Sequence, residues 1–161
     1  MKYNRFEELP VWQAVIALAE KVYALTADRA FARQRSLRDQ LERAAVSVSN
    51  NIAEGFERGT TQEVITFLYI ARGSSGEVRS LLCLIERLPL FGHLKFEISN
   101  LKSAAEEISR QLRAWADSLQ NSSIKGQRHL TEKTRRFEHA KKEREQFLQE
   151  PRAQSGETSK V

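Results

Sequence analysis

Residues 98–119, with the sequence ISNLKSAAEEISRQLRAWADSL, place apolar side chains at alternating intervals of three and four residues. The apolar positions are Ile98, Leu101, Ala105, Ile108, Leu112, Trp115 and Leu119. Because an α-helix has about 3.6 residues per turn, such intervals put these side chains on one helical face, and their repeat is typical of helices packed side by side. The stretch therefore predicts a helix of which one face is buried against other helices.

Three earlier segments have similar helical periodicity, and no segment alternates with the two-residue period of a strand. The expected helices cover about residues 8–28, 36–58, 61–88 and 95–119. Only 3 prolines and 7 glycines occur, so the connections between the helices should be short. Short connections make neighbouring helices antiparallel, and the sequence predicts an all-α, up-down-up-down four-helix bundle over residues 1–120.

Several residues mark the expected helix ends. Pro10 suits the first turn of the first helix. Ser36 with Asp39, and Thr60 with Glu63, have the spacing of capping boxes for the second and third helices. Gly59 and Pro89 are placed to end those two helices. On the first helix, the expected apolar face includes Trp12 and Tyr23.

The basic excess of the chain lies mostly in its C-terminal part. The formal net charge is +5, but residues 1–120 hold 16 basic and 15 acidic side chains, whereas residues 121–161 hold 10 and 6. The latter segment has too few apolar residues for a continuous buried stripe, although its i,i+4 ion pairs could support a solvated helix. We expect a charged tail that is partly helical or disordered.

The sequence lacks the patterns of common catalytic and metal sites. Di-metal bundles use Glu-x-x-His pairs, but the residues three places before His93, His129 and His139 are leucine, glycine and arginine. No nucleophile, histidine and carboxylate form a known triad pattern, so a non-enzyme without cofactor or metal is expected. The lone Cys83, the absence of an apolar signal core and the absence of a run of about 20 apolar residues favour a cytoplasmic protein that does not cross a membrane.

Two polar segments suggest contact surfaces. In the second helix, Ser47, Asn51, Glu54 and Arg58 belong to a polar stripe that contains poor helix formers, which a merely solvated face would not need. In the third, residues 72–76 (RGSSG) lack the ending of a phosphate-binding loop and lie within a helical pattern. Gly73 and Ser74 are therefore expected to let another helix approach closely, within the subunit or between subunits.

Three stretches resemble the bacterial four-helix-bundle family of 23S ribosomal RNA intervening-sequence proteins. They are FEELPVWQ (residues 6–13), RAAVSVSNNIAEGF (residues 43–56) and FLYIARGSSGE (residues 67–77). The resemblance implies a homopentamer related to Avd, the accessory protein of diversity-generating retroelements, which binds nucleic acid and a reverse transcriptase. It implies no defined activity for the intervening-sequence proteins themselves.

Two functions remain open for this chain. The first is an oligomeric protein that binds RNA or DNA, or that assists a reverse transcriptase, since symmetry multiplies weak phosphate contacts. Candidate phosphate-binding residues are Arg29, Arg33, Arg35 and Arg38 between the first two helices, and Arg135, Arg136, Lys141 and Lys142 in the tail. The alternative is a homo-oligomeric protein-interaction scaffold, whose binding would tolerate salt. An enzyme is the third and least supported class.

Overall fold

The computed structural model describes residues 3–58 and 60–122, and every secondary-structure element assigned within them is helical. The α-helices are α1 (Pro10–Thr26), α2 (Arg35–Arg58), α3 (Thr61–Arg87) and α4 (Lys95–Gln120). Three 3-10 helices connect or precede them: η1 (Phe6–Glu8), η2 (Arg29–Arg33) and η3 (Pro89–Leu94). The prediction of an all-α chain with four long helices is confirmed.

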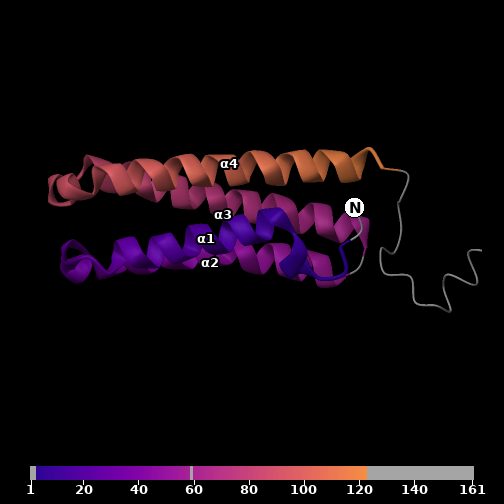
Figure 1. The fold of residues 1–161 in the computed structure, drawn as a ribbon, viewed down its shortest axis with the longest axis horizontal. Helices are drawn as coiled ribbons and strands as arrows, with labels where there is room; N and C mark the ends of the chain where they lie inside the picture. The colour runs from indigo at the N-terminus through magenta and orange to yellow at the C-terminus, as the bar shows by residue number, and fades with distance from the viewer. Residues whose placement is uncertain (1–2, 59, 123–161) are drawn as a thin grey trace, which may run out of the picture. The chain divides into compact units, whose positions relative to one another are not determined.

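The four α-helices lie alongside one another as a bundle in which α2 packs against α1 and α3, and α4 packs against α3 and α1 (Figure 1). Consecutive helices run in opposite directions, so η2 and η3 lie at the same end of the bundle (Figure 1). Two segments about 60 residues apart in sequence therefore become neighbours. This end of the bundle carries the candidate arginines.

The first α-helix is shorter than the range expected from its apolar pattern, which was about residues 8–28. Leu9 is extended, with φ −72° and ψ 121°, because the ring of Pro10 disfavours a helical conformation in the residue before it. Residues Phe6–Glu8 therefore form a separate 3-10 helix. At the other end, Asp28 is extended with ψ 142° and begins η2.

The two capping boxes expected from sequence have different outcomes. Thr60 is the N-cap of α3, and its hydroxyl oxygen accepts a hydrogen bond from the backbone N–H of Glu63, so that prediction is confirmed. By contrast, α2 begins at Arg35, so Ser36 lies inside the first turn and is not the N-cap. The predicted capping box at Ser36 and Asp39 is therefore wrong. Gly59 lies outside the described residues.

The core runs the length of the bundle and consists mostly of aliphatic side chains, with Phe31 and Phe91 at one end and Phe56 near the end of α2. The largest fully buried side chains include Phe31, Phe91, Leu18, Leu41, Ile52, Leu68, Leu82, Ile85, Ile98 and Leu112. Tyr23 was expected on the apolar face of the first helix, but it is 49% exposed. It lies one residue after the fully buried Val22, so its side chain is rotated about 100° from the core.

Helices α2 and α3 approach closely at Gly55. A Cβ atom at this buried position would lie 2.6 Å from the Cβ atom of Phe67 on α3, which is closer than two non-bonded carbon atoms can approach. Glycine is thus required sterically here, although it costs about 1 kcal/mol of helix propensity relative to alanine.

Candidate nucleic-acid interface

Arginine side chains gather at the connection between α1 and α2. The sequence predicted a short connection here, and its residues Arg29–Arg33 form the 3-10 helix η2. The carboxylate of Asp28 accepts a hydrogen bond of 2.8 Å from the backbone N–H of Ala30, and Ala30 and Phe31 are buried. Because these two residues anchor η2 to the core, the flanking residues Arg29 and Arg33 remain exposed.

The four predicted arginines of this region are not equivalent. Arg38 forms ion pairs with Asp39 at 3.2 Å and with Glu42 at 3.9 Å, so carboxylates compensate its charge. Arg33 and Arg35 are exposed and form no hydrogen bond or ion pair with any other side chain in the described ranges. The structure therefore places three exposed arginines on η2 or directly after it: Arg29, Arg33 and Arg35, called the arginine cluster below. Of these, Arg29 interacts electrostatically with the adjacent Asp28, and Arg33 and Arg35 are the uncommitted cations.

The connection between α3 and α4 lies beside this arginine cluster and is fixed to it by two contacts. The rings of Phe31 and Phe91 are in contact, with centroids 4.6 Å apart and planes inclined at 49°. The ring nitrogen Nε2 of His93 lies 3.2 Å from Oδ1 of Asp28. The hydrogen bond from the Ala30 N–H lowers the pKa of Asp28 most, and the hydrogen bond to His93 lowers it further.

The other predicted phosphate-binding residues cannot be placed. Arg135, Arg136, Lys141 and Lys142 lie outside the described residues, as does the segment 123–161 as a whole.

The polar stripe of α2 joins α2 to α3 within one chain. The hydroxyl oxygens of Ser47 and Ser74 are hydrogen-bonded at 2.9 Å across the two helices. The side-chain amide of Asn51 donates to the carbonyl oxygen of Ser47 at 2.7 Å and to its hydroxyl oxygen at 3.1 Å. These half-buried groups satisfy one another, so Ser47, Asn51 and Ser74 have a role in the packing of the subunit itself.

Glu54 and Arg58 form a separate surface cluster at the far end of α2. Their side chains make a 2.7 Å ion pair, and Arg58 also reaches Glu63 on α3 at 3.7 Å. The guanidinium carbon of Arg58 lies 4.9 Å from the ring centroid of Phe67. The hydrogen bond to Glu54 is the largest cause of the raised pKa of Arg58. The cluster links α2 to α3 on the outside of the bundle.

Gly73 differs from Gly55 in its surroundings. A Cβ atom at Gly73 or at Gly76 would meet no atom within 4 Å among the described residues, and both glycines are exposed. Among the described residues, no other helix therefore approaches them closely. The close approach expected at Gly73 is therefore not made by any of the described helices, and a contact at Gly73 between subunits stays a prediction.

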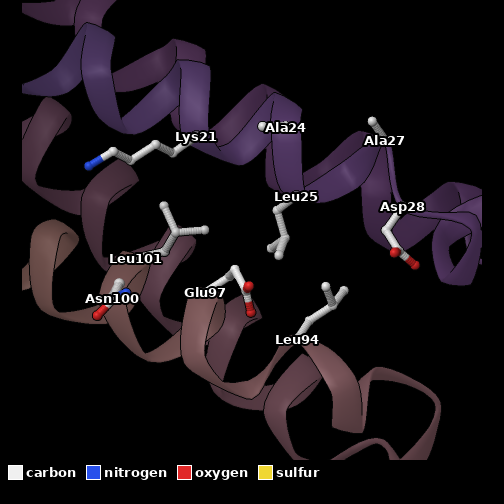
Figure 2. Close-up of a pocket in the computed structure, with 9 residues that line it drawn as sticks. All are labelled: Lys21, Ala24, Leu25, Ala27, Asp28, Leu94, Glu97, Asn100 and Leu101. Atoms are coloured by element: carbon white, nitrogen blue, oxygen red, sulfur yellow. The ribbon is translucent and has the colours of Figure 1, made fainter.

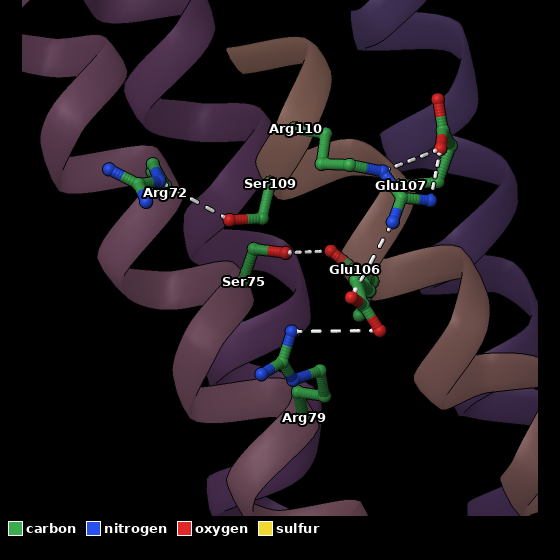
Figure 3. Close-up of polar contacts among 8 residues, drawn as sticks. Arg72, Ser75, Arg79, Glu106, Glu107, Ser109 and Arg110 are labelled. Atoms are coloured by element: carbon green, nitrogen blue, oxygen red, sulfur yellow. Dashed lines mark hydrogen bonds and ion pairs between the residues drawn. The ribbon is translucent and has the colours of Figure 1, made fainter. Parts of the chain in front are cut away.

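A polar network between α3 and α4 was not predicted from the sequence (Figure 3). The buried hydroxyl of Ser75 donates to the carbonyl oxygen of Ala105 at 2.7 Å, and Nε of Arg72 donates to the hydroxyl oxygen of Ser109 at 3.4 Å. Arg79 lies 3.8 Å from Glu106. Arg72 and Arg79 are seven residues apart and thus on one helical face, but only the packing reveals that this face borders α4.

The model of one protein family, the 23S rRNA-intervening sequence protein family, matches residues 7–114. The chain belongs to this family. No curated protein matches the chain.

The match to the 23S rRNA-intervening sequence protein family covers the bundle from η1 into the second half of α4. It includes the arginine cluster, the α2–α3 polar contacts and the α3–α4 network, and it ends before residues 121–161. Among the described residues of this family member, no helix has the length and apolar character required to span a bilayer. In the same part of the chain, no three His, Cys, Asp or Glu side chains are grouped to hold a metal ion.

This member of the 23S rRNA-intervening sequence protein family also has a groove between α1 and α4 (Figure 2). The groove has a volume of about 590 Å³, and Leu25, Leu94 and Leu101 form its apolar part. Lys21 and Glu97 line it from opposite helices. It lies next to Asp28 and therefore adjoins the end of the bundle that carries the arginine cluster.

Proposed function

We propose that this protein is a non-catalytic oligomer that binds nucleic acid through the phosphate backbone. The observation that carries the proposal is the arginine cluster Arg29, Arg33 and Arg35 at one end of the bundle, with two of its guanidinium groups uncommitted within the described residues. Arginine binds phosphate through fixed, paired N–H donors, and exposed arginines hold their charge at all physiological pH values.

Repetition by symmetry makes this small cluster effective. Three arginines in one subunit give only weak binding, but several copies in one assembly increase the overall affinity without any new contact. A homopentamer is the assembly that we propose. Exposed large apolar side chains on α3 support self-association: Ile70 is 47% exposed and Leu84 is 50% exposed.

Size-exclusion chromatography with light scattering tests both parts of the proposal on the full chain. We expect a mass close to five chains and co-elution with a single-stranded RNA, and binding that weakens steeply between about 50 and 200 mM salt. A monomer that does not bind RNA or DNA at the lower salt concentration contradicts both the assembly and the function.

Paired variants identify the contact residues. Replacing both Arg33 and Arg35 by glutamine should weaken binding by about tenfold or more and reduce the slope of log affinity against log salt by at least about 1.4, since each lost phosphate contact removes about 0.7 and every engaged subunit loses two contacts. The matched control replaces Arg5 and Arg110, which are exposed and already paired with Glu7 and Glu107. Equal losses in the two double variants would show that only net charge matters.

A protein-interaction scaffold is the second candidate. It is favoured by Leu90, which is 50% exposed, and Phe96, which is 75% exposed, at the same end of the bundle as η2. A partner protein would cover these side chains, and a reverse transcriptase is the partner that we propose to test. Salt-tolerant binding of that protein, lost in a Phe96→Ser variant and kept in the Arg33/Arg35 variant, would favour the scaffold.

A further inference from the structure

A second polar groove lies between α3 and α4, along the middle of the bundle rather than at its end. It has a volume of about 390 Å³ and is lined by Tyr69, Arg72, Gly73, Gly76, Arg79 and Ser109, among others. Figure 3 shows Arg72 and Arg79 entering this region from α3, with Ser109 and Glu106 facing them from α4.

Arg72 has an unusual position for a charged side chain. It is half-buried, and its hydrogen bond in the described part of the chain is to the neutral hydroxyl of Ser109 at 3.4 Å. No described carboxylate lies within ion-pair distance of it, whereas Arg38, the other half-buried arginine among these residues, pairs with two carboxylates. A partly desolvated cation without a counter-charge favours binding of an anion.

The neighbouring Arg79 is held only loosely. Its 3.8 Å contact with Glu106 is close to the limit for an ion pair, and both side chains are about half exposed. Glu106 also contacts Arg110 at 3.5 Å, while Arg110 is bound more closely by Glu107 at 2.5 Å. An incoming anion can therefore recruit Arg79 with little loss of interaction inside the protein.

Gly73 and Gly76 leave the mouth of the groove open. Each costs about 1 kcal/mol of helix propensity relative to alanine, and neither is needed for close packing among the described residues, because a Cβ atom would meet nothing within 4 Å. A side chain at Gly76 would instead project beside Arg72 and Arg79, which line the same groove. The missing side chains give a ligand direct access to the two guanidinium groups.

Tyr69 adds an exposed aromatic ring next to the two cations. It lines the groove, is 41% exposed, and has a hydroxyl group that accepts a 3.5 Å hydrogen bond from the amide of Gln120. An exposed ring beside a positively charged groove is the combination by which proteins bind single-stranded nucleic acid, with the base on the ring and the phosphates on the cations.

We propose that the α3–α4 groove binds one nucleotide unit of a single strand. The base stacks on Tyr69, its phosphate is bound by Arg72, and Arg79 leaves Glu106 for an adjacent phosphate. This inference rests on the proposed nucleic-acid-binding function, but it places a specific contact on the side of the bundle, away from the arginine cluster.

Fluorescence anisotropy with a labelled single-stranded oligoribonucleotide of about 12 nucleotides tests nucleotide binding in the groove, with the full chain as the protein. Arg72→Gln should weaken binding at least tenfold and lower the salt slope by at least about 0.7, one lost contact for each engaged subunit, and Tyr69→Leu should weaken binding about tenfold. The matched control is Arg43→Gln, because Arg43 is an exposed arginine that lines the groove between α1 and α2. It should change binding less than twofold.

A second variant avoids any dependence on the folding of Arg72 variants. Gly76→Glu places a carboxylate in the open mouth of the groove, and it should raise the melting temperature through helix propensity while it abolishes binding. Ser103→Glu adds the same charge at an exposed position of α4 and should leave most of the binding intact.

The outcomes separate the two proposals. If the wild-type protein binds the strand and Arg72→Gln equals Arg43→Gln, the groove is wrong and the nucleic-acid function stands. If the wild-type protein binds no strand at low salt, both proposals fail. If Arg72→Gln alters the oligomeric mass, Arg72 belongs to a contact between subunits, and the proposal that the groove binds a nucleotide is wrong. If adenosine monophosphate binds as tightly as the oligoribonucleotide, the proposal that the groove's ligand is a single strand is wrong.

Discussion

The hydroxyl group of Ser75 on α3 donates a 2.7 Å hydrogen bond to the carbonyl oxygen of Ala105 on α4, inside the core. Ser75 is only 1% exposed, so this bond gives a buried polar group its partner. Ser75→Ala removes the hydroxyl group that donates this hydrogen bond. It should lower the free energy of unfolding by about 1 kcal/mol, measured by urea denaturation. Ser80→Ala, at an exposed position of the same helix, should change it by less than about 0.5 kcal/mol.

The contact between Gly55 and Phe67 predicts opposite effects for two glycine substitutions. Gly55→Ala should destabilise the protein by about 1 to 3 kcal/mol, because the new methyl group would lie 2.6 Å from the Cβ atom of Phe67 and force α2 away from α3. Gly76→Ala should stabilise it by about 0.5 to 1 kcal/mol through helix propensity. Thermal unfolding of both variants checks the pair, and equal signs would contradict the packing described here.

The contact between Phe31 and Phe91 predicts that the two inter-helix connections depend on each other. Both side chains are 1% exposed. Each single change to leucine should destabilise the protein, and a double-mutant cycle should give a coupling energy of about 0.5 to 1.5 kcal/mol beyond the lost buried area. A coupling energy near zero would mean that the connections are stabilised independently.

Asp28 predicts an acid-dependent loss of stability. The hydrogen bonds from Ala30 and His93 hold the pKa of Asp28 below its reference value of 3.8, so the charged carboxylate is favoured in the folded state. Its contribution is complete above the unfolded-state pKa and is lost as the pH falls through the lower folded-state pKa. The difference in stability between wild type and Asp28→Asn should therefore be present at neutral pH and shrink as the pH falls below about 4. A difference that does not change with pH would contradict this account.

The repeat of apolar residues was sufficient to predict the helices and most of the core, because burial of one helical face is a local, periodic property of the sequence. It was less accurate where two adjacent residues compete for the core. On α4, the half-buried residue is Trp115 and the nearly fully buried one is Ala116, because the large ring fits at the edge of the interface, not within it.

The candidate site was only partly predictable. A cluster such as Arg29, Arg33 and Arg35 is visible in sequence because its members are adjacent. The role that we propose for Arg72 depends on which helix lies beside it and on the absence of a carboxylate within ion-pair distance among the described residues, and both are properties of the packing. Likewise, the sequence does not distinguish Gly55, which has a close neighbour on α3, from Gly73, which has none among the described residues.

The order in which the helices pack has a consequence for the rate of folding. Of the four main interfaces between the described α-helices, three join helices that follow each other in sequence, and the fourth, between α1 and α4, closes the bundle across the chain. Such short-range topologies fold within microseconds to milliseconds. We expect α2 and α3 to be structured in the transition state and the α1–α4 interface to form last, so that mutations at Leu25 or Leu101 should accelerate unfolding and leave the refolding rate nearly unchanged. Stopped-flow measurements of both rates check this expectation. If closure of the bundle were the nucleating event, the same mutations would slow refolding and leave the unfolding rate nearly unchanged.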